Sequence, residues 1–150
     1  MKVRILLCSL FSISLLVPFA CDEEKIASVE GTWIGTKAEG EVLVFGVPSG
    51  FEEVDDTFSP VLELKPGGIV TLTEHSSLSR SGTWSQHGEK LETNIGFQTN
   101  FVQLSGMYTI QRLAEKNLVL YFEKDGTFTD PDTGIKIEGT LKASLTFQKK

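Results

Sequence analysis

The sequence predicts an all-β protein, an antiparallel up-and-down β-barrel of eight strands. Apolar and polar residues alternate with a period of two in successive segments, which is typical of strands with one buried face. Glycine and proline turns separate these segments, and no helical pattern of useful length follows residue 30. The clearest segment is 135–147, where the odd positions are almost all apolar and the even positions are polar.

The same alternation predicts seven strands and the connections between them. The strands are expected at residues 59–65, 68–74, 81–86, 89–95, 102–112, 117–124 and 135–147, the last with a bend at Gly139. Tight turns are expected at residues 65–68, 86–89 and 113–116, and longer loops at 48–58, 75–80, 96–101 and 125–134. Because tight and long connections alternate along the chain, a meander places all the long loops at one end of the barrel.

Residues 31–47 allow two interpretations. They form either one long bent strand, which gives eight strands, or a hairpin that turns at residues 38–40, which gives nine. One strand places the N-terminus at the end with the tight turns, and a hairpin places it at the end with the long loops. We favour one bent strand, because an even number of strands closes an up-and-down barrel without leaving an edge.

The N-terminus has the layout of a secretory signal peptide. Lys2 and Arg4 precede an apolar run that is too short to cross a bilayer as a stable helix, and the small residue Ala20 precedes Cys21. This arrangement resembles the lipobox of bacterial lipoproteins, in which the cysteine is acylated. Cys8 would leave with the leader, so Cys21 would have no partner for an internal disulfide.

We therefore expect a signal peptide at residues 1–20, a tether at 21–30 and a barrel domain at 31–150, with Cys21 as the lipid anchor. Loss of the leader removes Lys2 and Arg4 and changes the net charge from −6 to −8. An acidic domain argues against nucleic acid as a partner and against electrostatic adhesion to anionic lipid.

Two short motifs carry a resemblance to a known family. Glu30-Gly31-Thr32-Trp33 at the start of the first strand resembles the Gly-x-Trp signature of lipocalins, and Gly82-Thr83-Trp84 repeats it. Together with the lipobox, the chain is similar to the small bacterial lipocalin-like lipoproteins. The last strand has no arginine to cover the first tryptophan, as typical lipocalins have. The resemblance implies a lipocalin-like barrel anchored by lipid in the bacterial cell envelope, at the outer membrane or the cell surface.

The aromatic residues suggest where a ligand would bind. Five phenylalanines fall in or beside the expected long loops and form either an apolar mouth or a plug of the barrel: Phe51, Phe58, Phe97, Phe101 and Phe128. Tyr108 and Phe122 fall on the inward faces of their strands. One hypothesis is a barrel that binds a small hydrophobic or amphipathic ligand at these seven residues. The other is a filled barrel whose acidic, aromatic loops bind an envelope protein or inhibit an enzyme.

Catalysis, metal binding and cofactor binding have little support in the sequence. His75 and His87 are the two histidines. Neighbouring residues of a strand point to opposite faces, so the side chains from Glu74 to Ser77 are not expected to meet at one catalytic site. Acidic residues surround the loop 125–134, but a proline-glycine turn explains them better than a calcium site: Asp125, Asp130, Asp132 and Glu138. We expect no enzyme activity, metal or cofactor.

Overall fold

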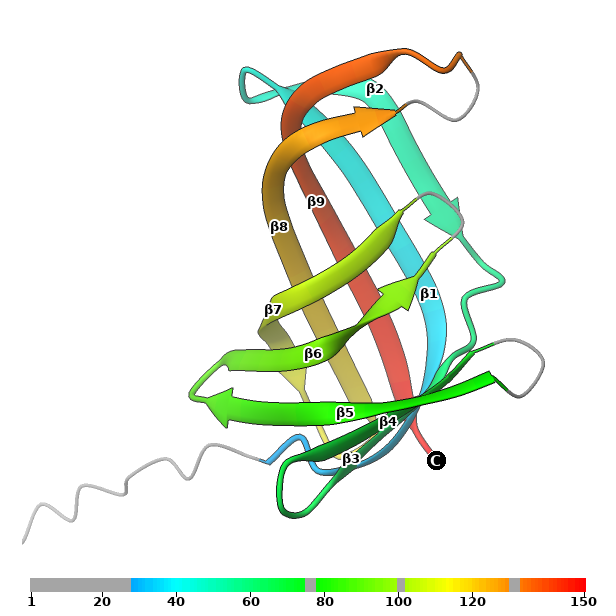
Figure 1. Cartoon of the computed structure of the whole chain (residues 1–150), viewed down its shortest axis with the longest axis vertical. Coiled ribbons are helices and arrows are strands. Elements are labelled where there is room, and N and C mark those ends of the chain that lie inside the picture. Colours follow the sequence, from blue (N-terminus) through cyan, green and yellow to red (C-terminus); the bar gives the residue numbers. More distant parts are fainter. Residues whose placement is uncertain (1–27, 75–77, 100–101, 130–132) are drawn as a thin grey trace, which may run out of the picture.

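Nine β-strands and no helix make up the part of the chain that the computed structural model describes, which is residues 28–74, 78–99, 102–129 and 133–150 (Figure 1). For residues 49–53 and Leu78 it describes the backbone alone. The strands are β1 (Gly31–Val44), β2 (Val47–Asp55), β3 (Val61–Lys65), β4 (Ile69–Glu74), β5 (Leu78–His87), β6 (Lys90–Gln98), β7 (Gln103–Leu113), β8 (Asn117–Thr129) and β9 (Lys136–Lys149).

Eight of these strands close into an antiparallel ring. They pair in the order β1-β3-β4-β5-β6-β7-β8-β9, and β9 pairs back onto β1 from Trp33↔Lys149 to Leu43↔Thr140. The predicted eight-stranded up-and-down barrel is confirmed. Each strand of the ring contributes apolar side chains to the interior, for example Trp33, Leu62, Val70, Trp84, Leu91, Leu104, Leu118 and Leu145.

The ninth strand, β2, lies outside the ring. The chain passes through residues 38–40 as one bent strand and reverses at Phe45 and Gly46, whose φ angles are 51° and 78°. Two successive positive φ angles are typical of the two-residue hairpin turn that matches strand twist. β2 then occupies most of the segment 48–58 and pairs with β1. The prediction of a loop there was wrong, because an edge strand tolerates proline, glycine and charged residues that hide the alternation.

The other expected long loops are also shorter than predicted. β5 begins at Leu78, β6 extends to Gln98 and β8 extends to Thr129. Phe97 and Phe128 therefore lie on strands rather than in loops. The pairing of β8 with β9 continues without interruption to Thr129↔Lys136, so backbone hydrogen bonds extend the strand past its last buried residue.

Beyond the ring, β2 and the ends of three long strands form an open sheet, here called the upper sheet. The three strand ends are residues 38–44 of β1, 136–144 of β9 and 121–129 of β8. The strand order of this sheet is β2-β1-β9-β8. Figure 1 shows these strands standing above the shorter β3 to β6, with β8 and β9 curving together at the top. Gly126 pairs with Gly139 in this part of β8 and β9.

The opposite end of the barrel is closed by the segment that precedes β1. Val29 is fully buried, and the indole Nε1 of Trp33 donates a 2.8 Å hydrogen bond to its carbonyl oxygen. The Lys149 ammonium lies 5.1 Å from the centre of the Trp33 ring, so a lysine of the last strand covers this tryptophan. The last residues of the predicted tether are thus packed against the floor of the barrel, at the end with the tight turns.

Gly139 and Gly126 face each other across β9 and β8 but differ in the space around them, which gives a matched test of the fold. A Cβ at Gly139 would lie 2.2 Å from the Leu43 carbonyl oxygen, whereas a Cβ at Gly126 would meet nothing closer than the Phe128 ring at 3.5 Å. We expect Gly139→Ala to lower the free energy of unfolding by at least about 2 kcal/mol. Gly126→Ala should change it by less than about 1 kcal/mol. Urea unfolding measures both, and equal effects would contradict the close approach of β1 to β9.

Candidate functional site

Five aromatic rings fill the interior of the barrel where a ligand would have to bind. Phe97 is the centre of the group: its ring centroid lies 6.2 Å from that of Phe58, 5.5 Å from that of Tyr108 and 5.4 Å from that of Phe147. Tyr108 also contacts Phe122, with 5.7 Å between the centroids. All five side chains are at most 4% exposed. Edge-to-face and tilted contacts at these distances stabilise a packed core beyond simple burial.

These rings come from different parts of the ring of strands. Phe97, Tyr108, Phe122 and Phe147 lie on β6, β7, β8 and β9, and Phe58 lies just before β3. Tyr108, Phe122 and Phe147 point inward by alternation with less buried neighbours, as in the buried even positions of β8. An eight-stranded barrel has an interior of about the size that side chains can fill, so these rings are sufficient to occupy it.

The structure brings together four of the seven residues expected to bind a ligand. Phe58, Phe97, Tyr108 and Phe122 belong to the aromatic group, which also includes Phe147, a residue that the sequence analysis did not select. Phe128 lies on the upper sheet, is half-buried and packs against the buried core. The side chain of Phe51, all of Phe101 and the anchor Cys21 lie outside the described residues.

A polar clamp holds the loop ends of three neighbouring strands above the aromatic group. The Arg80 guanidinium donates a 2.6 Å hydrogen bond to the Glu74 carboxylate and a 2.8 Å bond to the Gly96 carbonyl oxygen. The other oxygen of Glu74 accepts a 2.7 Å bond from the Gln98 backbone N–H. Because β4, β5 and β6 are joined in this way, the barrel cannot widen at this point without breaking charge-assisted hydrogen bonds.

The Tyr108 hydroxyl is the polar group within this aromatic interior. It donates a 2.9 Å hydrogen bond to the Leu104 carbonyl oxygen of the same strand. Burial raises the pKa of Tyr108 well above its usual value of 10.0, because the interior disfavours the charged phenolate. The hydroxyl is therefore a neutral, satisfied donor and is not placed to act as a base.

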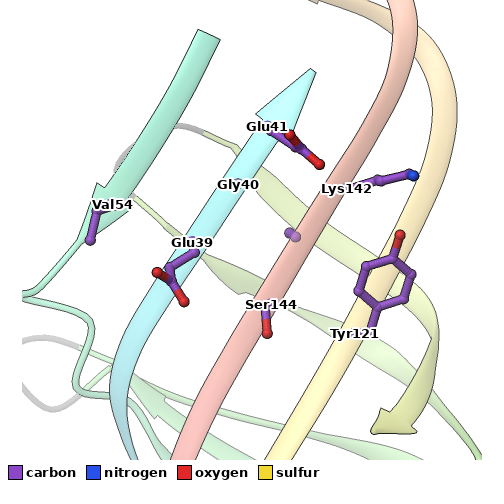
Figure 2. A pocket seen from close by; sticks show the side chains of 8 residues that line it. Glu39, Gly40, Glu41, Val54, Tyr121, Lys142 and Ser144 are labelled. Carbon is purple, nitrogen blue, oxygen red and sulfur yellow. The ribbon is translucent and has the colours of Figure 1, made fainter. Parts of the chain in front are cut away.

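A second candidate site lies on the outer face of the upper sheet. It is a shallow hollow of about 280 Å³, lined by side chains from all four strands of that sheet (Figure 2). The register sets two rows across the sheet: Glu41 of β1 lies opposite Lys142 of β9, and Glu39 lies opposite Ser144. Tyr121 of β8 continues the row of Ser144.

The charges of this hollow are unequal. Glu39, Glu41 and Lys142 line it, and Glu123 lies beside it. Glu39 already forms a 2.6 Å ion pair with Lys37, which leaves Glu41 as the lining carboxylate for a partner's cation. The Tyr121 hydroxyl donates a 2.7 Å hydrogen bond to Glu123. Burial, with the nearby carboxylates of Glu123 and Glu41, raises the pKa of Tyr121 to about 12. Carboxylates beside an aromatic ring form a suitable surface for an ammonium or guanidinium group of a partner.

The sequence analysis missed this outer hollow. Alternation does place Glu39 and Glu41 on one face of a strand, and Lys142 and Ser144 on one face of another. Alternation does not show that the first strand pairs with the last. This pairing is what brings the two glutamates beside Lys142 and Ser144. The acidic residues 52–56, within the segment expected as a loop at 48–58, belong to the end of β2 and the residue after it.

The polar residues considered for catalysis or metal binding do not form a site in the described parts of the chain. Asp125 accepts a 2.6 Å hydrogen bond from the Thr140 hydroxyl, and His87 is exposed at the end of β5. His75, Asp130 and Asp132 lie outside the described residues. Within those residues, no group of three or more His, Cys, Asp or Glu side chains is placed to hold a metal ion. The described segments also contain no helix long and apolar enough to cross a membrane.

Comparison with known proteins gives no family for this chain, because no protein-family model and no curated protein matches it.

Truncation of Phe97 tests whether the aromatic group is a packed core. We expect Phe97→Ala to lower the free energy of unfolding by about 3–5 kcal/mol, because the side chain contacts three other rings and leaves a cavity. Phe128→Ala is the control, with an expected loss of about 1 kcal/mol for a half-buried ring. Denaturant unfolding compares the two. Similar small losses would indicate a loosely filled interior with room for a ligand.

Alkaline pH tests the environment of Tyr108. Because the folded-state pKa is raised, the hydroxyl stays protonated in the folded protein while the unfolded chain ionises near pH 10. The stabilising contribution is therefore complete below about pH 10 and is lost as the pH rises further. Tyr108→Phe should be less stable than the wild type by about 1 kcal/mol at neutral pH, through loss of the bond to Leu104. This difference should shrink above about pH 10, and parallel stability profiles would contradict the prediction.

Proposed function

We propose that this protein is a lipid-anchored cell-envelope protein whose filled barrel holds a protein-binding surface on the upper sheet. In this proposal the barrel is a rigid support and the interaction is made outside it. The acylated Cys21 attaches the domain to the membrane, and an envelope protein is the partner.

The observation that carries this proposal is the packing of the barrel interior. Five aromatic rings contact one another inside the barrel, and each is almost completely buried: those of Phe58, Phe97, Tyr108, Phe122 and Phe147. A carrier of small molecules buries its ligand in a preformed hollow. The hollow on the upper sheet, by contrast, is on the outside of the molecule.

The position of the N-terminus supports the same arrangement. Ser28 follows Cys21 by seven residues, which span at most about 24 Å when extended. The segment joins the barrel at its floor, where Val29 is buried. A domain anchored there turns its floor toward the membrane and its upper sheet away from it, toward a partner.

A small hydrophobic or amphipathic ligand is the second candidate. It is favoured by the inner face of the upper sheet, where Val44, Phe128 and Ile137 are only half-buried above the aromatic group. A ligand there would contact these three residues and would rest on the aromatic group rather than displace it.

Native mass spectrometry distinguishes the two candidates. The Cys21→Ser chain is incubated with a lipid extract, and its native and denatured spectra are compared. We expect the mass of the free protein in both spectra, because an acyl chain would have to displace Phe97 from its contacts with three other rings. An added mass that appears only in the native spectrum, and that is lost in Phe128→Ala, would replace this proposal with ligand transport.

A further inference from the structure

We propose that Phe58 is a positioning residue for the outer hollow. Its ring, seated among the aromatic rings of the barrel, holds the end of β2 in place, and this end forms one wall of the hollow. The inference rests on the proposed function and names a residue that controls the shape of the proposed binding surface. Phe58 itself does not line the hollow.

The side chains of β2 that the structure describes contribute little to its attachment. Val47 and Val54 are 65% and 53% exposed, and Pro48 is exposed as well, whereas Asp55 is buried. In the described parts of the chain, β2 pairs with β1 alone, with a register shift within the pairing. Two strands with few buried side chains are marginally stable by themselves. The burial that these side chains lack is supplied by the segment after β2.

Residues 55–60, here called the plug segment, connect the end of β2 to the barrel interior. Phe58 is 1% exposed and Pro60 is buried, so alternate residues of this segment point into the barrel. The centroid of the Phe58 ring lies 6.2 Å from that of Phe97 and 5.7 Å from that of Phe147. The other four rings of the aromatic group lie on strands of the closed ring. Phe58 is therefore the aromatic contact between the chain of β2 and the interior.

The link between Phe58 and the hollow is short and held by hydrogen bonds. Val54 lines the hollow, where it lies opposite Glu39 of β1 (Figure 2). One carboxylate oxygen of the next residue, Asp55, accepts bonds of 3.0 Å and 2.7 Å from the backbone N–H and the hydroxyl of Thr57. A turn of this kind fixes the direction of the chain. A shift of Phe58 is therefore transmitted to Val54 rather than absorbed between them.

Gly35 of β1 forms the seat of the plug segment. A Cβ at this position would lie 2.6 Å from Cδ of Pro60 and 2.8 Å from the Phe58 ring, so the segment packs directly on the glycine backbone. The Gly35 N–H also donates a 2.8 Å hydrogen bond to the Pro60 carbonyl oxygen. The seat of Phe58 thus belongs to the same strand that contributes Glu39 and Glu41 to the hollow.

Release of the plug segment would change the hollow at its β2 wall. Val54 would leave its place opposite Glu39, and the edge of β1 that β2 covers would be open to water. The hollow therefore keeps its shape only while Phe58 is seated in the barrel. The alternative is that hydrogen bonds to β1 hold β2 without help from the plug segment.

Hydrogen exchange of backbone amides distinguishes these alternatives, with the Cys21→Ser chain as the parent of two matched variants. Phe58→Leu and Phe122→Leu each replace one buried ring of the aromatic group with a smaller apolar side chain. Phe122 contacts the Tyr108 ring and belongs to β8, at the opposite edge of the upper sheet from β2. Amides of β2 report its local opening, and amides between β8 and β9 report the opening of the barrel.

We expect Phe58→Leu to raise the exchange rates of the protected β2 amides by about tenfold. Both variants should lower the midpoint of urea unfolding, but Phe122→Leu should leave the β2 rates at the parent value. A purely structural role of Phe58 would change β2 equally in the two variants. Unchanged β2 rates in Phe58→Leu, or equal increases in both variants, would overturn the inference.

Gly35→Ala gives a second test that keeps all the aromatic rings. Its methyl group would meet Pro60 and Phe58 and displace the plug segment, so the β2 amides should exchange about fivefold faster or more. Gly126→Ala is the control, because a Cβ there meets nothing closer than 3.5 Å, and it should not change β2. A lack of response of β2 to Gly35→Ala would also overturn the inference, because β2 and the plug segment would then move independently.

These measurements use no partner and therefore separate this inference from the proposed function. If β2 exchange does not depend on Phe58 and the native spectra show the free protein, the interaction module stands and β2 is held by its own hydrogen bonds. An added lipid in the native spectra would overturn the proposed function, whereas the exchange rates would still show whether Phe58 holds β2.

Discussion

The pairing of β1 with β9 is the constraint on which the rest of the molecule depends. It joins the first strand to the last across almost the entire described chain and closes the ring of eight strands. Contacts between such distant segments form only after the loop between them is ordered, which costs entropy and slows folding. Local hairpins alone would leave β1 and β9 as exposed edges. Closure removes these edges and seals the aromatic core between them.

The same two strands also create the upper sheet. β1 pairs with β3 only from Gly31 to Ile34, yet its pairing with β9 continues to Leu43. The long strands therefore extend past the short ones, and β8 and β2 become the two edges of an open sheet. One edge is interrupted by Pro48, whereas the other is regular and carries charges of both signs at Glu123, Lys124 and Asp125.

The sequence was sufficient to predict the barrel but not the hollow on the outer face of the upper sheet. Alternation located the strands from residue 59 onward, because one face of each is buried and its period is two. It failed at β2, which lies outside the ring, and at Phe97, which was expected in a loop but lies on β6. Of the two interpretations of the phenylalanines, a mouth or a plug of the barrel, Phe58 and Phe97 agree with the plug. The outer hollow depends on the register of β1, β9 and β8. Register is set by long-range pairing, and no local pattern around Glu41 or Lys142 encodes it.

The filled interior and the outer hollow favour the same functional conclusion. A ligand placed among the aromatic rings would have to displace the Phe97 side chain from its three ring contacts. Binding at the outer hollow of the upper sheet does not require this change, because Glu39, Glu41 and Lys142 already line it. Preorganised groups lose less entropy on binding than groups that must first rearrange. A partner on the outside of the upper sheet, as we propose, would therefore require less reorganisation than a ligand inside the ring of strands.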